Sequence, residues 1–556
     1  MDLIKKQIKE KIESTLDATD VVVEEPKKGV ADLAIPLFAF SKLWKTSSQN
    51  VYGKIEPILK DDHRIKTIEF SNGFLNIYLK RVDLSNHILK DIVAKDHMYG
   101  SEKLEDDAVI CMDFSSPNIA KSFSVGHLRS TMIGNALRNI YQKLGYKTIA
   151  INHLGDWGTQ FGKMIVAYQK WGDEEKVKAN PIIELQKLYV RFHKEEEKDS
   201  VLEQAGRNAF LKLEKGDLDY VKLWTWFKDE SLREFMEMYD LLGVDFDAYD
   251  GESFYNDKMD AIVDELSEKN LLRIDEGATI VDLEAGMPPA LIKKSDGATL
   301  YITRDIAALL YRNKTYQFKK MLYVVGNEQR LHFEQLKKVT DLMGYDFDII
   351  HINFGLVLVD GKKMSTRSGK FTRLEDVLKE AIRLAKDAIS LKNPNLKDKD
   401  GVARAVGVGA IIFNDLKNER HLDVDFNLEN MVRFEGQTGP YLQYSGVRIA
   451  SILREHAYDS AKVDASHYAE DHYFEIVKQL SQFPIILKKS MEVNAPNLIA
   501  RYILSLAQAF NSFYGKQRIV MDDIGHKQAN LLFVKAIQIV LNEGLRMLGM
   551  IPLQEM

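Results

Sequence analysis

The segment from Asp113 to His127 combines the side chains and backbone groups that a phosphate-binding loop needs. It follows a short apolar run, 109–112, that fits a strand buried on both faces, and it leads into a periodic helix. Gly126 lets a flat ring or a phosphate approach the backbone, and the free N–H groups of a helix start attract anions. His127 can donate to phosphate oxygens and Lys121 can add a positive charge. Taken alone, the segment is equally compatible with a Gly-His turn at an ordinary helix start.

A second segment, from Asp360 to Arg373, is strongly basic. It carries five Lys or Arg residues from Lys362 onward with no acidic residue between them, and Gly361 and Gly369 would let it move. Mobile cations suit a site where the negative charge of a triphosphate develops in a transition state. A solvated basic loop is the alternative. The chain lacks the pattern GxxxxGK[ST], which disfavours a P-loop ATPase.

Both segments need a sheet of parallel strands to hold them. The first half of this region supplies a strand, a loop, a helix and a second strand, which together make a βαβ unit. The same alternation returns after a charged helical stretch, and ligands bind such sheets at the carboxyl ends of the strands. The expected strands are 109–112, 147–152, 298–302, 321–325 and 348–357, and the expected helices are 126–144, 305–312 and 328–343.

These patterns predict an α/β protein whose Rossmann-type, doubly wound domain is split by a helical insertion. An opening helix and alternating strand patterns at 67–70 and 74–78 indicate an α+β unit before it, and periodic helices after about residue 400 indicate an all-α bundle. The expected segments are 1–107 for the α+β unit, 108–375 for the Rossmann domain with its insertion at about 171–242, 376–435 for a linking helical region, and 436–556 for the bundle.

Length and composition narrow the class of protein. The 556 residues suggest three or four domains, and 45% hydrophobic with 28% charged residues is ordinary globular composition. The net charge of −6 means that any nucleic-acid binding must come from local patches. The single cysteine, Cys111, excludes an internal disulfide framework and a multi-cysteine zinc or iron–sulfur site. Without a signal peptide or a long apolar run, we expect a soluble, cytoplasmic protein.

Several longer motifs resemble one family. The first segment contains the sequence Ser-x-Gly-His before a helix, and the second contains Lys-Met-Ser after the last strand. These two signatures together are typical of class I aminoacyl-tRNA synthetases. The wider set is similar to arginyl-tRNA synthetase, from the GFLN segment at 73–76 to the end of the chain. Its members are SSPNIAK (115–121), VGHLRST (125–131), NHLGDWGTQFG (152–162), YITRDIAA (301–308) and GPYLQYSGVR (439–448).

Two positions depart from the family pattern. Ser124 stands where the first signature usually begins with histidine, and Thr366 stands where many class I enzymes have a second lysine. A serine hydroxyl can still donate one hydrogen bond. The resemblance implies that Lys121 supplies the missing charge near the phosphates, and Arg367 is an alternative.

The resemblance also implies a role for individual residues. The catalytic set is Lys121, Ser124, Gly126, His127, Lys363, Met364 and Ser365. The ATP-binding set is Lys121, Gly126, His127, His332, Lys363 and Met364. The arginine-binding set is Asn118, Glu252, Tyr301, Asp305 and Gln329. The tRNA-binding set is Asn76, Tyr514 and Met556.

The arginine-binding set suits its ligand chemically. A guanidinium group has five donors in a plane, so its pocket should offer carboxylate, carbonyl or hydroxyl acceptors. Without the resemblance, Asp305 is an acid at a helix start, Glu252 and Gln329 are surface polar residues, and Tyr514 is a core aromatic.

The resemblance implies ATP-dependent attachment of L-arginine to tRNA(Arg) through an arginyl-adenylate, with release of AMP and pyrophosphate. ATP enters as a substrate together with Mg²⁺, and we expect no zinc, no other bound metal, no membrane partner and a monomer. One alternative is another class I synthetase or a small-molecule nucleotidylyl transferase. Another is a catalytically inactive, synthetase-like RNA-binding or regulatory protein, which only Ser124 and Thr366 motivate.

Overall fold

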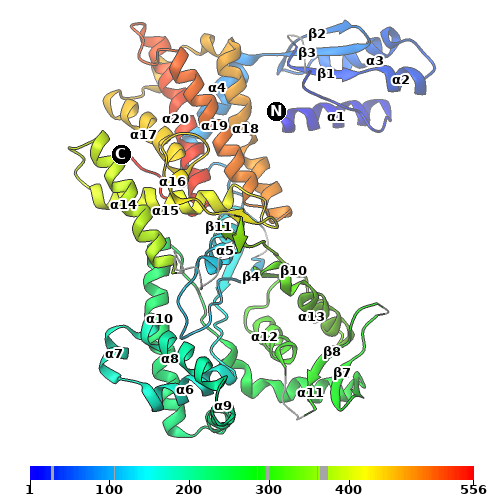
Figure 1. Cartoon of the computed structure of the whole chain (residues 1–556). Helices are drawn as coiled ribbons and strands as arrows, with labels where there is room; N and C mark the ends of the chain where they lie inside the picture. The colour runs from blue at the N-terminus through cyan, green and yellow to red at the C-terminus, as the bar shows by residue number, and fades with distance from the viewer. Residues whose placement is uncertain (27–30, 105–106, 285, 296–299, 360, 364–372) are drawn as a thin grey trace.

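A four-stranded parallel sheet lies at the centre of the computed structural model, which describes all residues except 27–30, 105–106, 285, 296–299, 360 and 364–372 (Figure 1). Its order is β10-β9-β4-β5. The strands are β4 (Val109–Asp113), β5 (Lys147–Ile151), β9 (Lys320–Tyr323) and β10 (Ile349–His351). Since the chain runs from β4 to β5 on one side and places β9 on the other, the strand order reverses between β4 and β9. Ligands bind at such a point in open α/β sheets.

Three helices connect these strands: α5 (Val125–Lys143), α12 (Tyr301–Tyr316) and α13 (Arg330–Leu342). The strand expected at 298–302 is wrong where the structure describes it, because Tyr301 and Ile302 begin α12; 298–299 lie outside the described residues. The single strand expected at 348–357 is also wrong. It ends at His351, and Val357 begins β11 (Val357–Val359), which pairs with β12 (Lys362–Lys363) and β13 (Val424–Asp425) in a separate sheet.

The helical insertion expected after β5 is present. Aspartates at 173, 199 and 217 accept backbone N–H bonds at three of its helix starts, and Gly243 ends the last helix at φ 68°. The helices are α6 (Thr159–Trp171), α7 (Glu174–Ala179), α8 (Pro181–Glu196), α9 (Ser200–Glu214) and α10 (Leu218–Leu242). Beyond them lie η2 (Glu252–Lys258), α11 (Met259–Glu268) and an antiparallel sheet of β6 (Leu272–Asp275), β7 (Ala278–Val281) and β8 (Ala290–Lys293).

The N-terminal α+β unit has its own small core. Its antiparallel sheet has the order β1-β3-β2, and the expected strands at 67–70 and 74–78 fall within β2 and β3. The elements are α1 (Asp2–Leu16), β1 (Leu33–Pro36), α2 (Phe38–Leu43), α3 (Ser48–Lys60), β2 (Ile65–Ser71) and β3 (Phe74–Leu79). The next helix, α4 (Arg81–Lys95), packs against C-terminal helices α18 and α20.

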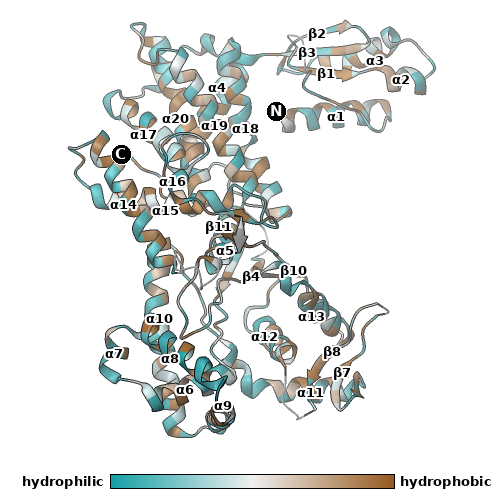
Figure 2. Cartoon of the chain, in the orientation of Figure 1, coloured by the Kyte–Doolittle hydropathy of each residue, from teal (hydrophilic) through white to brown (hydrophobic). Residues whose placement is uncertain are grey.

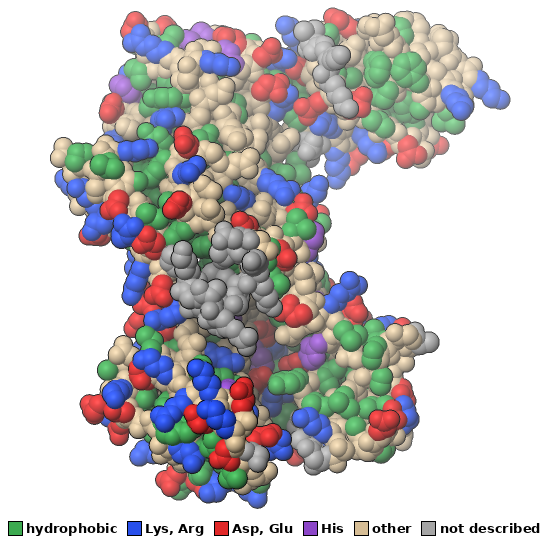
Figure 3. Space-filling view, viewed as in Figure 1, with side chains coloured by type: hydrophobic (Ala, Val, Ile, Leu, Met, Phe, Trp, Pro, Cys, Tyr) green, Lys and Arg blue, Asp and Glu red, His purple; other side chains and the backbone are tan. Residues whose placement is uncertain are grey.

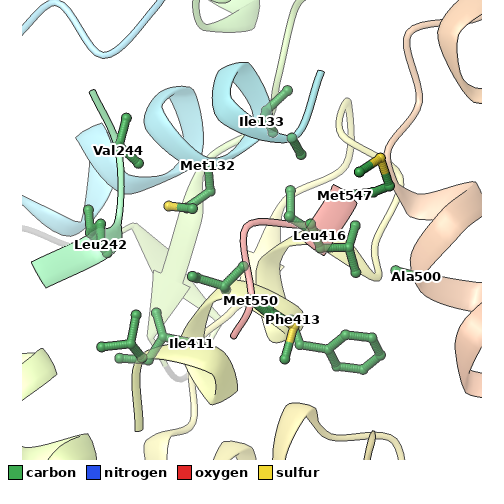
Figure 4. Close-up of a cluster of buried hydrophobic side chains, with 14 of the residues drawn as sticks. Met132, Ile133, Leu242, Val244, Ile411, Phe413, Leu416, Ala500, Met547 and Met550 are labelled. Atoms are coloured by element: carbon green, nitrogen blue, oxygen red, sulfur yellow. The ribbon is translucent and has the colours of Figure 1, made fainter. Parts of the chain in front are cut away.

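After the central sheet the described chain is mostly helical, as expected. The long helices carry many apolar side chains (Figure 2), and these join α5 and α10 in one core, to which Met132, Leu242, Phe413 and Met547 belong (Figure 4). This shared core fixes the helical part against the sheet. The helices are α14 (Leu374–Lys392), α15 (Lys399–Leu416), α16 (Leu428–Met431), α17 (Gly439–Glu455), α18 (Asp471–Glu492), α19 (Asn497–Lys516) and α20 (Ile524–Met547). None of the described helices has the length and apolar run that crossing a bilayer requires.

Candidate active site

The loop after β4 lies at the point where the strand order reverses, and its backbone is strained. Ser115, Ser116 and Ala120 have φ values of 71°, 47° and 58°, which residues with side chains rarely adopt. Buried hydrogen bonds hold this shape. The N–H of Ser115 donates to Ser130 Oγ at 2.8 Å, and its hydroxyl lies 2.8 Å from the hydroxyl of Tyr239. The loop is therefore fixed before any ligand arrives.

Ser124 and His127 form one unit at the start of α5. The backbone N–H of Ser124 donates to His127 Nδ1 at 3.0 Å, and the Ser124 hydroxyl lies 3.2 Å from the same nitrogen. Because Nδ1 accepts, the imidazole hydrogen is on Nε2. Burial, with the charge of Lys121, lowers the pKa of His127 to about 4. His127 is thus a neutral hydrogen-bond donor beside the exposed Gly126.

The described residues at both ends of the basic segment 360–373 are fixed in place, and those after it contact the loop of the first signature. On one side, β12 places the backbone of Lys363 opposite Leu358. On the other, the N–H of Leu374 donates at 2.9 Å to the carbonyl of Phe123, the residue before Ser124. The side chain of Lys363, and the whole of Met364, Ser365, Thr366 and Arg367, lie outside the described residues.

Asp305 lies between two histidines. Its Oδ2 is 2.5 Å from His332 Nε2, and its Oδ1 is 4.0 Å from His153 Nε2. Burial alone would raise the pKa of Asp305, but the hydrogen bond and charge of His332 outweigh it and lower the pKa. In return the pKa of His332 is raised, because Asp305 overcomes the effect of burial. Asp305 is therefore an ionised carboxylate whose orientation is fixed.

Glu252 is a second carboxylate, close enough to Asp305 for the two charges to interact. Burial raises its pKa, Arg304 opposes that shift, and the negative charge of Asp305 adds to it. Its nearest ion-pair partner among the described residues is Arg304, with Arg304 Nη1 3.8 Å from Glu252 Oε2. Tyr301, one turn before Asp305 on α12, lies on the same helix face and is 66% exposed. The carboxylates and this hydroxyl could accept hydrogen bonds from a planar cation.

Asn118 and Gln329 lie at the borders of this region. Asn118 pairs with Gly155, and any side chain at 155 would clash with its amide, since a Cβ there would be 2.1 Å from Asn118 Oδ1. Gln329 is exposed in the short helix η3 (Asn327–Gln329), one turn before His332.

A hollow separates the insertion from the lobe of α11–α13, and Lys and Arg side chains gather on the insertion's side of it (Figure 3).

Of the residues predicted to bind tRNA, two share one groove. Tyr514 and Met556 line a groove of about 580 Å³ between α17 and α19, together with Tyr444 and Arg448. The Arg448 guanidinium lies 4.8 Å from the centre of the Tyr514 ring and 5.1 Å from that of Tyr444. Asn76 lies far away along the chain, in β3 opposite Glu69. Aromatic faces with an adjacent cation suit single-stranded bases.

Sequence reasoning missed two residues that lie beside the two carboxylates, His153 and Arg304. His153 belongs to the motif 152–162 and Arg304 to the motif 301–308, but sequence reasoning assigned neither of them a role. The signal that could have found them is the two predicted carboxylates, Asp305 and Glu252, because buried carboxylates need cationic or donor partners. Among the described residues, no cluster of three or more His, Cys, Asp or Glu side chains could hold a metal ion.

Models of known protein families match three segments of the chain. The profile described as tRNA synthetases class I (R), catalytic domain, matches residues 88–428. The profiles described as Arginyl tRNA synthetase N terminal domain and DALR anticodon binding domain match residues 2–79 and 442–556. The chain belongs to the class I arginyl-tRNA synthetase family. The expected class of fold, with a parallel-sheet catalytic core between an α+β unit and a helical domain, is confirmed.

Full-length members of the arginyl-tRNA synthetase family are similar to this chain. An arginine–tRNA ligase of Exiguobacterium sp. is 48% identical over 98% of this chain and 97% of its own length. One from Ligilactobacillus salivarius is 47% identical over 99% of this chain and 98% of its own length. The Thermus thermophilus arginyl-tRNA synthetase structure has a TM-score of 0.83 at 22% identity, with 100% of both chains covered, and so shares the fold.

Ser124 takes a structural part in the family's first signature. As N-cap of α5 it holds His127, and the contact that fixes the imidazole hydrogen on Nε2 comes from its backbone. Ser124→Ala removes the hydroxyl that lies 3.2 Å from His127 Nδ1, and it should lower the free energy of unfolding by about 1 kcal/mol, as is typical when an N-cap serine becomes alanine. The rate of amino-acid activation should fall less than tenfold. Denaturant unfolding and ATP–pyrophosphate exchange measure the two effects, and a loss above 100-fold would contradict this account.

Proposed function

We propose that this chain joins L-arginine to tRNA(Arg) at the expense of ATP. The observation that carries the proposal is the closeness of two carboxylates, Asp305 and Glu252, next to the segment 154–155 that binds the loop after β4. Arginine–tRNA ligases that are 47–49% identical over nearly the full length support it. A cationic, planar side chain is the ligand that such a pocket favours.

In the proposed reaction the arginine carboxylate attacks the α-phosphate of ATP, and pyrophosphate leaves. The resulting arginyl-adenylate then transfers arginine to a hydroxyl of the terminal adenosine of the tRNA, the 2′-hydroxyl in class I enzymes, and AMP leaves. No protein nucleophile is needed. The chain's residues act by positioning and by charge: Lys121 and the second signature meet the phosphates, and neutral His127 donates from Nε2. Mg²⁺ enters bound to ATP.

Pyrophosphate exchange into ATP tests this function directly. Each amino acid is supplied in turn, with and without tRNA(Arg). Exchange with arginine and with no other amino acid is the expected result. Exchange only when tRNA is present would show that the tRNA completes the site. Absence of exchange in every condition, with tRNA still bound, would instead favour a synthetase-like RNA-binding protein.

We further propose that the chain acts as a cytoplasmic monomer with no metal of its own, and that its functional segments are 1–107, 108–375, 376–435 and 436–556. Size-exclusion chromatography with light scattering, in the presence and absence of tRNA, checks the oligomeric state. Limited proteolysis checks the segment limits, because exposed linkers between compact units are cut first.

The groove of Tyr514 is proposed to hold an anticodon base. Tyr514→Ala should weaken tRNA(Arg) binding about tenfold, since stacking one base on an aromatic ring is worth ~1–3 kcal/mol. The KM values for arginine and ATP should stay within twofold. Tyr514→Phe keeps the ring and should bind like the unaltered protein. Filter binding or fluorescence anisotropy gives the affinities, and equal binding by the alanine variant would refute the assignment.

A further inference from the structure

The loop that carries Lys121 rests on the helical insertion, to which the sequence assigned no role. Two contacts come from α10. The N–H of Ala120 donates to Ser231 Oγ at 2.9 Å, and Phe123 packs edge-on against Phe235 with ring centres 5.7 Å apart. These contacts anchor the two ends of the short segment that contains Lys121.

Two further contacts come from a single face of α8. The Ser122 hydroxyl donates to Gln186 Oε1 at 2.6 Å, and Lys121 Nζ lies 5.7 Å from the centre of the Tyr189 ring. Gln186 and Tyr189 are three residues apart, so they project side by side from the helix. The ammonium group therefore lies within cation–π range of an aromatic face that belongs to the insertion.

The Tyr189 ring is itself held in place. His193, one turn further along α8, packs against it edge-on with ring centres 4.5 Å apart. His193 Nδ1 lies 3.0 Å from Glu196, whose carboxylate also binds Lys163 of α6 at 2.6 Å. The buried residues Leu185 and Phe192, one turn before and after Tyr189, fix α8 beside the ring. The ring is thus a rigid surface.

Among the described residues, no counterion places Lys121. In the described part of the chain no carboxylate lies within 4 Å of its ammonium group, although the group is half-buried, and burial lowers its pKa. An aromatic face orients a cation without neutralising it, so the charge stays available for an anionic ligand. A carboxylate partner would instead compete with phosphate for the same charge.

We propose that Tyr189 and Gln186 are positioning residues that hold Lys121 where it meets the phosphates of ATP. The proposal rests on the role that the proposed function gives to Lys121. The insertion then forms part of the site of amino-acid activation, because α8 fixes both the ammonium group of Lys121 and the next residue, Ser122. Tyr189 contributes its ring, and Gln186 fixes the backbone through Ser122.

A double-mutant cycle in ATP–pyrophosphate exchange, run with arginine and tRNA(Arg), tests whether Tyr189 acts through Lys121. Tyr189→Leu should lower the exchange rate at saturating substrates about tenfold, with the KM for arginine within twofold. Tyr189→Phe, which keeps the ring, should stay within twofold, as should Val190→Ala, an exposed neighbour on α8. In a Lys121→Ala background, Tyr189→Leu should cost less than twofold more. Losses that multiply would overturn the proposal.

Chemical labelling tests, independently of catalysis, whether α8 holds the Lys121 ammonium group in place. Acetic anhydride at low concentration modifies amines according to their exposure and mobility, and peptide mass spectrometry gives the extent at Lys121. Tyr189→Leu and Gln186→Ala should raise labelling of Lys121 severalfold, whereas Tyr189→Phe should not. Unchanged labelling would refute the positioning role, even if exchange were altered. If the unaltered protein showed no exchange, the proposed function would fail while this result still stood.

Discussion

Asp305→Ala is expected to weaken arginine binding by about 100- to 1,000-fold while the KM for ATP changes less than threefold. Removing one partner of a buried, hydrogen-bonded charge pair costs ~3–5 kcal/mol, because the other charge is left buried and unpaired. Here the substrate guanidinium would be that charge. Asp305 is ionised and oriented by His332 at 2.5 Å, so arginine meets a carboxylate that needs no reorganisation.

Two variants separate this effect from a general disturbance of the pocket. Asp305→Asn keeps the shape of the side chain and its acceptor oxygen, so it should lose less arginine affinity than the alanine variant. Asp341→Ala removes an exposed carboxylate on the neighbouring helix α13 and should leave both KM values unchanged. The KM for arginine in ATP–pyrophosphate exchange is the measurement. Arginine affinity that survives in both Asp305 variants would exclude it as the guanidinium partner.

Long periodic patterns made most of the fold predictable from the sequence. The α5 pattern repeats its apolar positions over several turns, β4 is a short, mostly apolar run and β5 ends in one, so their type was correct. The segment 298–302 failed because five residues are too few to separate the two periods. Its aromatic and β-branched residues favour a strand locally, yet α12 begins at Tyr301.

That error has a consequence for the site. A strand ending near residue 302 would put Tyr301 and Asp305 on either side of a turn. With α12 beginning at Tyr301, they lie one turn apart on the same helix face. Contacts across the fold, such as Asp305 with His153 or Lys121 with Tyr189, could not be predicted. They join residues that are 152 and 68 positions apart, and no local pattern encodes such pairs.

Lys121→Ala is expected to lower the rate of amino-acid activation by about 100- to 1,000-fold, with the KM for arginine within twofold. Losing one preorganised group that stabilises transition-state charge costs ~2.7–4 kcal/mol. Two features make Lys121 more important for the rate. Thr366 stands where many class I enzymes have a lysine, so the second signature has one cation fewer. His127, whose pKa is lowered to about 4, supplies a hydrogen bond but no positive charge near neutral pH.

Substitution by arginine tests whether charge alone is enough. Lys121→Arg keeps the charge but replaces a compact ammonium group by a planar fork, so it should restore only part of the rate. Exchange kinetics at varied concentrations of ATP and arginine give the maximal rate separately from the KM for each substrate. Equal losses in rate and arginine affinity would contradict an electrostatic role and point to a collapsed loop. The alanine variant is informative because the strained loop is held by Ser130, Ser231 and Tyr239, none of which contacts the ammonium group, so removing that group leaves the loop's anchors intact.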